Sequence, residues 1–520
     1  MSLPASTFAS VPLLFLEAAD SELREYLAEI PPLVSSAPAL LSLVDADLDA
    51  HGCRKKAVRV VDARWREVHS VPLPGAAPVP TEVDPKSLKL GLGRPRTPAF
   101  VVLVAVLLRG FLGAGFKARD PDMMLAESVT LRVFFKNQGY TMPGRSTLTE
   151  LCNAVSNRTR LSILDAQTAL VLRLGFDDFS VMLQDSTHVE GSTVWPVDSR
   201  MLVGLVSRLA HIGAVLPRLN VSAVVSPGVD RRLAEMRVLD REISLAPARP
   251  GRGRERRKRY EQLIKRARRV LALLNPLIAA REAELQSLDV LPSRKAMAVR
   301  AVAQMRTDLT ALAQVIANSN ARVIHEQKVP MADKKLSISD TDVGFIAKGQ
   351  RVPVVGYKPQ IARSGRGFIV GLLLPQGNAA DSGQLVPMLD SVIARTGVVP
   401  TVVSVDDGYS SKDNVAAMKA RGVNVRSING AKGRALTDPG DWDSEPYAGA
   451  RGQRSAVESI MYTLKYGYNF GEVARRGLEA VYGELLEKAL AFNLCHLARA
   501  RRAATEAAAR AAAPPLAAAA

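Results

Sequence analysis

The stretch VMLQDSTHVEGSTVWPVDSR (181–200) begins as an apolar run and then turns polar at once. The letters VML (181–183) are followed by a glutamine and by DST (185–187). A buried strand that stops on a carboxylate has two explanations. Asp, Ser and Thr often end strands because they form turns. Alternatively, the strand brings Asp185 to a functional site at the edge of a sheet, and the rest of the sequence must decide between the two.

A second stretch repeats this pattern near the C-terminal end of the chain. The β-branched run VVPTVVSV (398–405) is followed by DDGY (406–409). Around it the sequence predicts strands over 351–361, 365–375 and 423–428 and helices over 380–396 and 410–422. Alternating strands and helices indicate an α/β layer fold. Ligand sites in such sheets favour the carboxyl ends of strands, where Asp185 and Asp406 are expected.

A third acid lies in RGQRSAVESIMYTLKYGYNF (451–470). Arg454, Glu458 and Lys465 are four and then seven residues apart, which places them on one stripe of a helix. An Arg–Glu pair at this spacing also stabilises ordinary surface helices, so that explanation stays open. Two strand-end aspartates and a helix glutamate are ligands suited to Mg²⁺. Two such ions about 4 Å apart can clamp the attacking and leaving oxygens at phosphorus.

Composition points to an anionic partner. The 520 residues include 69 Lys and Arg against 51 Asp and Glu, a net charge of +18, which favours nucleic acid over a membrane. Three distant cysteines show no disulfide or zinc spacing and fit a reducing cytoplasm. The apolar run at 99–108 is too short to span a bilayer, and the N-terminus lacks the basic start of a signal peptide.

The densest positive charge lies at 249–269, where 11 Lys and Arg stand against two Glu. Apolar residues at spacings of three and four follow, and they predict a helical hairpin over about 254–320. A basic entry of this kind suits phosphate contacts, although it also suits the solvated face of a helical bundle. The candidate contacts are Arg256, Arg257, Lys258 and Arg259.

Residues 99–160 read as helical. One helix is expected over 120–135, and a second is expected to start at 146 with a capping box made by Thr147 and Glu150. Two helices across a short turn fit a helix-turn-helix and equally fit a helical bundle. Residues 1–90 show no recognisable chemistry, and the tail from about 501 is of low complexity and expected to fray.

Taken together, the motifs resemble a bacterial insertion-sequence transposase of the DDE type, with the ISNCY group as the nearest match. The motif DST followed by P-V-D-S (185–199), the stretch GNAADS (377–382) and DDGY (406–409) have the order of that group. Arg454, Glu458 and Lys465 match the spacing of the last catalytic helix, although Arg451 stands where related transposases have a tyrosine. The resemblance covers roughly 90–500.

The resemblance implies an α/β fold, a ribonuclease H-like mixed sheet flanked by helices, over 176–500. A helical-hairpin insertion would interrupt it at about 220–330, because 221 residues separate Asp185 from Asp406. Residues 1–90 would form a region of unknown role, 91–175 a helical region for DNA binding or dimerisation, and 501–520 the tail.

The resemblance also implies an activity. The protein would bind the terminal inverted repeats of its element, cleave at their ends and join the 3′-hydroxyl to target DNA as a homodimer. Asp185, Asp406 and Glu458 would be catalytic and hold Mg²⁺ or Mn²⁺, while Arg454, Lys465 and Arg451 would contact DNA. Two alternatives remain, a metal-dependent nuclease without strand transfer, and an immobile transposase relic or DNA-binding regulator.

Other residues near these motifs compete for the same roles. Glu190, Asp198 and Asp407 are close enough in sequence to be mistaken for ligands. Strand alternation predicts that Asp407 points away from Asp406, and Asp198 is better read as a helix cap. His188 is expected to form an ordinary hydrogen bond rather than to bind a metal.

Overall fold

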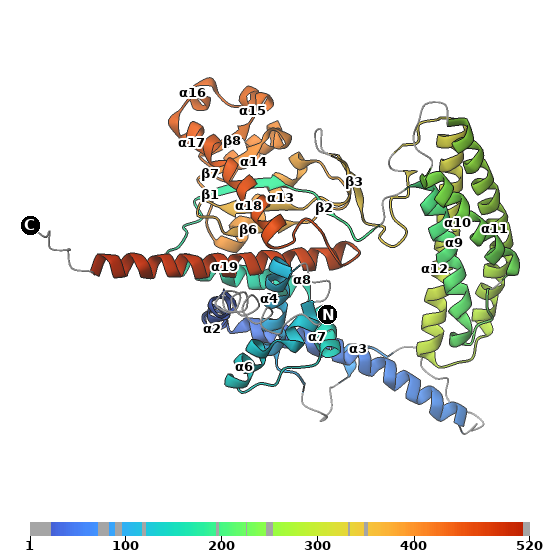
Figure 1. The fold of residues 1–520 in the computed structure, drawn as a ribbon. Helices are drawn as coiled ribbons and strands as arrows, with labels where there is room; N and C mark the ends of the chain where they lie inside the picture. Colours follow the sequence, from blue (N-terminus) through green and yellow to red (C-terminus); the bar gives the residue numbers. More distant parts are fainter. Residues whose placement is uncertain are drawn as a thin grey trace, which may run out of the picture. The chain divides into compact units, whose positions relative to one another are not determined.

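The computed structural model divides the chain into two compact units (Figure 1). Unit 1 contains Met1–Asp49, Gly93–Ser192 and Ile346–Ala520, and unit 2 contains Ala50–Leu92 and Thr193–Phe345. The residues that the structure describes are 22–70, 83–88, 96–116, 121–193, 197–224, 226–245, 253–330, 333–347 and 352–512. Residues 71–82 and 89–95 and the last eight residues of the tail are among those that lie outside them.

Unit 1 is built on a mixed five-stranded sheet with the order β6-β5-β1-β7-β8. Strand β1 lies at the centre, antiparallel to β5 and parallel to β7. This sheet and its flanking helices confirm the predicted fold class, a ribonuclease H-like mixed sheet with a largely helical N-terminal region. The strands are β1 (Val181–Ser186), β5 (Gln360–Ser364), β6 (Ile369–Leu373), β7 (Val402–Asp406) and β8 (Val425–Asn429).

The central strands are covered on both faces, which explains their continuous apolar runs. Met182, Leu183, Val403 and Val405 are all buried. Helices α13 and α14 pack against β5, β6 and β8, while α17, α18 and α19 contact β7, β1 and β6 (Figure 1). These helices are α13 (Leu385–Thr396), α14 (Lys412–Ala420), α17 (Glu445–Gln453), α18 (Ser455–Gly467) and α19 (Leu478–Ala512). Shorter helices in the same region are η6 (Asp381–Gln384), η7 (Asp407–Tyr409), α15 (Ala431–Leu436) and α16 (Pro439–Trp442).

The prediction of a single strand over 351–361 is wrong. The segment contains β4 (Val354–Tyr357), which belongs to a separate three-stranded sheet, and the first residues of β5. The chain changes sheets at Pro359, which has no N–H to donate to a ladder and therefore tends to interrupt a strand. The small sheet has the order β2-β4-β3, with β2 at Val189–Glu190 and β3 at Gly344–Ile346.

The helical prediction for 99–160 is confirmed in outline and wrong in its details. The helix expected over 120–135 is broken at Ser128, whose hydroxyl accepts a hydrogen bond from the Leu131 N–H and caps a new helix. The next helix begins at Arg145 with Gly144 as its N-cap, so the expected capping box at Thr147 does not form. The described helices that precede β1 are α2 (Ile30–Ser36), α3 (Ala39–Ser70), α4 (Ala99–Phe116), α5 (Pro121–Glu127), α6 (Val129–Asn137), α7 (Arg145–Ala154) and α8 (Asn157–Arg173), with the turn η2 at Pro85–Ser87.

Helix α19 joins these N-terminal helices to the sheet, since it packs on α4 and α8 and also on β6. Its buried Glu487 binds Arg160 of α8 at 2.6 Å and Arg475 at 2.5 Å, and Arg109 of α4 lies 3.8 Å away. Burial alone would raise the pKa of Glu487, but the three guanidinium groups outweigh it and lower that pKa to about 2. Over 501–512 the expected fraying is also wrong, because α19 continues to Ala512 through alanine, the best helix former, whereas the rest of the tail lies outside the described residues.

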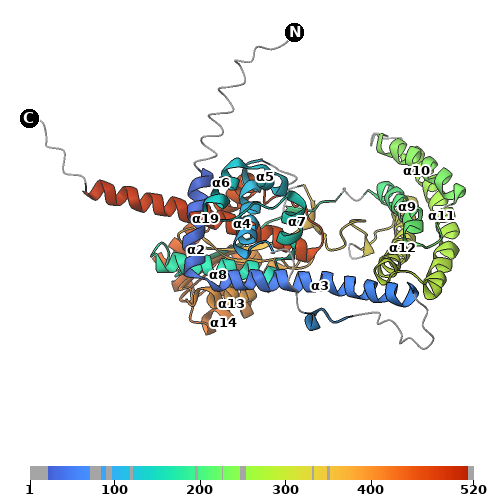
Figure 2. The ribbon, with the colours of Figure 1, turned by 90° about the horizontal axis from the view of Figure 1, so that it is seen from below.

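In unit 2, the helices α9 to α12 (Figure 2) pack around a core of their own, and the unit also includes residues 50–70 of α3. The predicted hairpin corresponds to α11 (Gly253–Ser287) and α12 (Pro292–Ser319), and α9 (Asp198–Val215) and α10 (Pro227–Leu245) pack beside it. The turns η3 (Leu216–Leu219) and η4 (Asn320–Ile324) extend α9 and α12. By length and composition the segment Asp198–Leu219 could span a membrane, yet its Leu202, Leu205 and Leu209 are buried in this core.

Candidate active site

Strands β1 and β7 bring Asp185 and Asp406 to the same level of the sheet. Their parallel register pairs Val181 with Val402 and Leu183 with Ser404. Continued by two residues, that register places Asp185 beside Asp406, the last residue of β7. The apolar runs form these strands, and the change to polar residues at their carboxyl ends sets the two acids at one edge of the sheet.

Strand alternation then fixes the face on which the two acids lie. Arg363 of β5 pairs with Leu183 and donates to the Ala456 carbonyl of α18 at 2.8 Å. The Ser404 hydroxyl donates to the Ala450 carbonyl of α17 at 3.0 Å. Side chains two residues apart on a strand share a face, so Asp185 and Asp406 point to the side covered by α17 and α18.

Arg454, between α17 and α18, lies among three carboxylates. Its Nη2 is 3.6 Å from Asp185 Oδ2 and 3.8 Å from Asp406 Oδ2, and its Nη1 is 3.1 Å from Glu458 Oε1. The other oxygen of each aspartate accepts a backbone hydrogen bond, from the Ser186 N–H at 2.7 Å and from the Gly408 N–H at 2.9 Å. The structure therefore brings together the three acids that the sequence singled out, with a guanidinium between them.

The three acids differ in exposure. The side chain of Asp185 is 9% exposed and that of Asp406 is 22% exposed, whereas that of Glu458 is 63% exposed. The aspartates are thus held on the sheet, and the glutamate reaches the site from a solvent-facing side of α18. Burial, followed by the negative charges of Asp381, Asp185 and Asp406, holds the pKa of the buried Tyr409 hydroxyl well above its usual range.

The competing residues near the motifs have other partners. Asp407 accepts from the Gly433 N–H and from the Ser410 hydroxyl, both at 2.9 Å, and so points away from the three acids as expected. Asp198 is the first residue of α9 and forms an ion pair with Arg322 at 3.1 Å, so the expected side-chain cap is absent. His188 Nε2 lies 3.4 Å from Lys465 Nζ, the kind of ordinary contact that was predicted.

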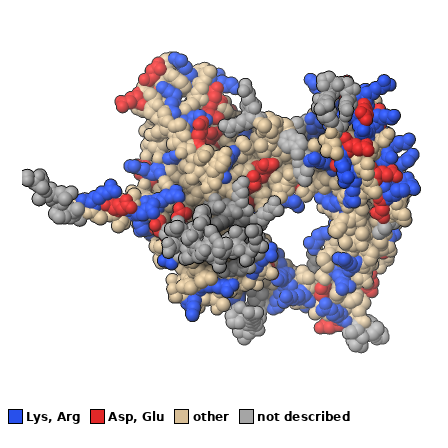
Figure 3. Space-filling view, in the orientation of Figure 1, with Lys and Arg blue, Asp and Glu red and all other residues tan. Residues whose placement is uncertain are grey.

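The remaining predicted DNA contacts fall into two groups. In unit 1, Arg451 stacks over the Trp442 ring at 4.3 Å from its centroid and donates to the Trp442 carbonyl at 2.6 Å. Lys465 is half-buried on the same face of α18 as Glu458. In unit 2, the basic segment opens α11 at one end of the bundle, where Figure 3 shows Lys and Arg side chains gathered on the surface.

Two of the four candidate phosphate contacts in that segment form ion pairs within unit 2. Arg257 binds Glu326 at 2.6 Å, and Arg259 binds Glu255 at 2.7 Å and Glu242 at 3.0 Å. Arg256 lies over the Tyr260 ring at 5.9 Å from its centroid, and Lys258 is exposed. The segment thus presents positive charge to solvent, but the charges of Arg257 and Arg259 are already neutralised by neighbouring glutamates.

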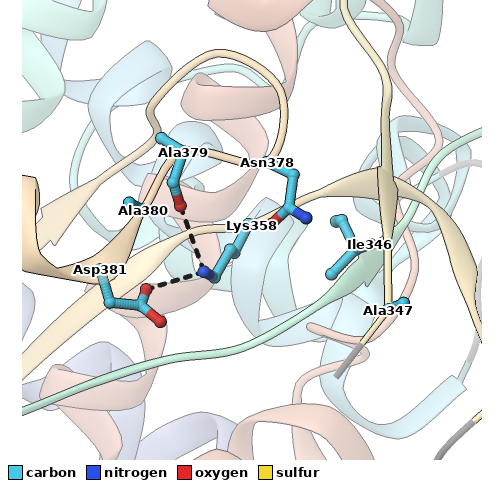
Figure 4. A pocket seen from close by; sticks show the side chains of 7 residues that line it. All are labelled: Ile346, Ala347, Lys358, Asn378, Ala379, Ala380 and Asp381. Carbon is cyan, nitrogen blue, oxygen red and sulfur yellow. Dashed lines mark hydrogen bonds and ion pairs between the residues drawn. The ribbon is translucent and has the colours of Figure 1, made fainter. Parts of the chain in front are cut away.

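Sequence reasoning missed Asp381. Its Oδ1 accepts from Gln360 Nε2 at 2.7 Å and lies 2.9 Å from Lys358 Nζ, which also donates to the Ala379 carbonyl (Figure 4). A Cβ added to Gly408 would lie 3.0 Å from Asp406 Oδ1 and 3.4 Å from Asp381 Oδ2, so the two acids flank this glycine. The only available signal was the motif GNAADS, in which no spacing marks one acid as part of the site.

Lys358 and Asp381 line a cavity of about 410 Å³ (Figure 4). Its other lining residues are Ile346, Ala347, Asn378, Ala379 and Ala380. The cavity has both a cation and an amide on its wall. It is therefore a recess of mixed character, lined by an ion pair, one amide and four apolar residues.

The donor set suits a hard divalent cation, because the side-chain donor atoms of all three acids are carboxylate oxygens. Among the described residues, no group of three Asp, Glu, His or Cys is close enough to share one ion as it stands. Instead, the guanidinium of Arg454 lies 3.1–3.8 Å from one carboxylate oxygen of each of the three acids. Binding of a cation at their centre requires that guanidinium to move.

Comparison with protein-family models gives a match within the C-terminal half of the chain. Searches of curated proteins and of solved structures found nothing significant. Residues 332–494, less than half of the chain, match the family model described as "Transposase DDE domain". The matched segment includes Asp406 and Glu458, whereas Asp185 lies upstream of it. The chain thus contains a DDE transposase domain, the domain of a polynucleotidyl transferase that acts in DNA transposition.

Proposed function

We propose that the protein is a DNA transposase that binds the terminal inverted repeats of its own element, cleaves at their ends and joins the 3′-hydroxyl to target DNA. Asp185, Asp406 and Glu458 are its catalytic residues and metal ligands. One observation supports this most strongly: a single guanidinium lies 3.1–3.8 Å from a carboxylate oxygen of all three. Two of the three acids also lie in the matched segment.

In this proposal the cofactor is Mg²⁺, which Mn²⁺ can replace. Asp185, Asp406 and Glu458 would hold a pair of such ions, which would supply activation of the attacking water or hydroxyl and stabilisation of the leaving oxygen. The protein supplies the geometry, because backbone N–H groups hold one oxygen of Asp185 and of Asp406 in place. Arg454 and Lys465 are cations on the face of the α18 segment that bears Glu458, and they would bind the phosphates on either side of the cleaved bond.

The proposed partners follow from the same chemistry. The net charge of +18 suits double-stranded DNA, both the element ends and the target. Two ends must be held at once, so at least a homodimer forms in the end complex. The proposed location is the cytoplasm, where three cysteines without a bridging partner remain reduced.

The test uses DNA taken from both sides of the gene, incubated with the full chain and Mg²⁺. We expect cleaved ends and joined products from the parent protein and none from Asp185→Asn, Asp406→Asn or Glu458→Gln. Asp407→Asn is the matched control. This neighbouring acid accepts a hydrogen bond from the first turn of α15, so its substitution should leave activity largely intact.

Each other outcome assigns a different function. If ends are cleaved but no joined products form, the protein is a nuclease that uses the same site and not a transposase. DNA binding without cleavage in any metal would leave an immobile relic or a DNA-binding regulator. Activity that survives all three acid-to-amide changes would end the assignment of these residues as catalytic.

A further inference from the structure

Helix α18 exposes two tyrosines that its packing does not use. Tyr462 is 66% exposed and Tyr466 is 73% exposed. Their ring centroids are 4.4 Å apart at an interplanar angle of 41°. The helix packs through Val457, Ile460, Met461 and Leu464 on its other face. Two adjacent aromatic rings are therefore presented to solvent without contributing to the core.

The position of these rings relates them to the candidate active site. Tyr462 follows Glu458 by four residues, so it lies one turn further along the same side of the helix. Lys465 follows Tyr462 by three residues and lies on that side as well. An aromatic surface thus continues directly from the glutamate of the site, with a cation beside it.

We propose that Tyr462 and Tyr466 form a stacking surface for unpaired bases of the DNA end next to the cleaved phosphate. This inference rests on the proposed function, since it requires DNA at the three acids. Aromatic side chains bind single-stranded bases through their faces, with little dependence on sequence, when neighbouring cations hold the backbone. Lys465 and Arg454 are such cations.

A second copy of the chain is the other occupant that an exposed aromatic pair could have. The surroundings favour DNA, because the face beyond the rings carries Glu458 and Lys465, which belong to the phosphate site of the proposal. A dimer contact on this face would cover the glutamate and block access to the acids. The stacking surface therefore has to stay free of protein for the site to work.

The experiment compares two double variants in EDTA, so that no cleavage occurs. Tyr462→Ala with Tyr466→Ala removes both rings, and Tyr462→Phe with Tyr466→Phe keeps them. Ser459→Ala, exposed on the same helix, is the matched control. The probes are a blunt duplex and the same duplex with a three-nucleotide 3′ overhang that contains 2-aminopurine, whose fluorescence falls when it stacks.

We expect the alanine pair to lose the quenching and to bind the overhang duplex at least about five-fold more weakly for each stacked base, with blunt duplex binding unchanged. The phenylalanine pair and Ser459→Ala should behave as the parent. Alanine substitution favours the exposed helix, so loss of folding is not expected and circular dichroism verifies it.

Three results would overturn the inference. The alanine pair could bind the overhang duplex with unchanged affinity, or it could lose equal affinity for the overhang and the blunt duplex. It could also form a smaller oligomer than the parent in light scattering. If the parent still cleaves and joins DNA in those cases, only the stacking surface is lost. A parent that binds neither duplex would overturn the proposed function together with it.

Discussion

Arg454 Nη2 lies 3.6 Å from Asp185 Oδ2, and this contact places a positive charge where the proposed catalysis needs a metal ion. The same guanidinium approaches Asp406 and Glu458. In the absence of a divalent cation, Arg454 thus reduces the mutual repulsion of the three carboxylates. The sequence placed Arg454 near phosphates, whereas the structure adds that it is the counter-ion of the acids.

A first prediction concerns the competition between Arg454 and a metal ion. Partly exposed ion pairs are typically worth about 0.5 kcal/mol each. Loss of two or three of them on metal binding corresponds to roughly a tenfold change in affinity. Arg454→Ala should therefore bind Mn²⁺ about tenfold more tightly than the parent in the absence of DNA, as measured by electron paramagnetic resonance.

Arg451→Ala is the control for that measurement, because its guanidinium stacks on Trp442 instead of approaching the acids. It should leave Mn²⁺ affinity unchanged. Arg454→Ala should also bind element ends more weakly, so metal and DNA affinities would move in opposite directions. Equal Mn²⁺ affinity in the parent and in Arg454→Ala would contradict the idea that the guanidinium competes with the ion.

Strand-end patterns made the two aspartates predictable, since β1 and β7 are apolar runs that end on an acid and their parallel register then aligns Asp185 with Asp406. The contact of Arg454 with all three acids was not predictable from the sequence. Helical spacing determines which residues share one face of a helix, but it does not determine which strands that face packs against. Asp381 was missed for a related reason. It enters the site from a turn before α13, and no periodic pattern marks a turn residue as part of a site.

A second prediction tests whether Asp381 belongs to the site. Its carboxylate is 13% exposed and pairs with Lys358, so Lys358→Met would leave an extra uncompensated charge beside Asp406. The variant should bind Mn²⁺ more tightly and lose stability in metal-free buffer, by about 3 kcal/mol as for other buried pairs that lose one partner. Urea denaturation with and without Mn²⁺ measures both effects. Asp381→Asn should show the opposite change in metal affinity, and no change in either variant would exclude Asp381 from the site.

A third prediction concerns Lys465, whose Nζ lies 3.4 Å from His188 Nε2. Lys465→Ala should weaken end binding and slow cleavage while leaving the fold intact, because a phosphate contact is lost. Lys465→Arg should restore binding only in part, since a planar guanidinium does not reproduce a compact ammonium group. Gel shift and single-turnover cleavage measure the two effects, and cleavage by Lys465→Ala at the parent rate would exclude this role.

A fourth prediction addresses how the N-terminal helices are fixed to the sheet domain. Glu487 is buried and binds Arg160 and Arg475, so Glu487→Gln leaves buried guanidinium groups without their carboxylate. The free energy of unfolding should fall by about 3–5 kcal/mol at pH 7. The pKa of Glu487 is lowered from 4.5 to about 2, so the native state keeps this group charged where the unfolded chain would protonate it.

The stability that Glu487 provides is therefore complete above pH 4.5 and is lost as the pH falls toward 2. Urea denaturation should show that the free energies of unfolding of the parent and of Glu487→Gln differ strongly at pH 7 and less at pH 3. Glu506→Gln, further along the same helix and exposed, is the control and should change little at either pH. If the difference in the free energy of unfolding stays constant from pH 7 to pH 3, the ionisation of Glu487 is not linked to stability.

The last prediction concerns the basic segment at the start of α11. Each phosphate contact that is lost should reduce the salt slope of DNA binding by about 0.9. Arg257 and Arg259 already bind glutamates, whereas Arg256 and Lys258 show no such ion pair among the described residues. The double variant Arg256→Ala with Lys258→Ala should thus flatten the slope more than Arg257→Ala with Arg259→Ala. Fluorescence anisotropy at several salt concentrations measures both slopes. If both stay at the parent value, the segment is a solvated face of the bundle, and its net charge has no part in DNA binding.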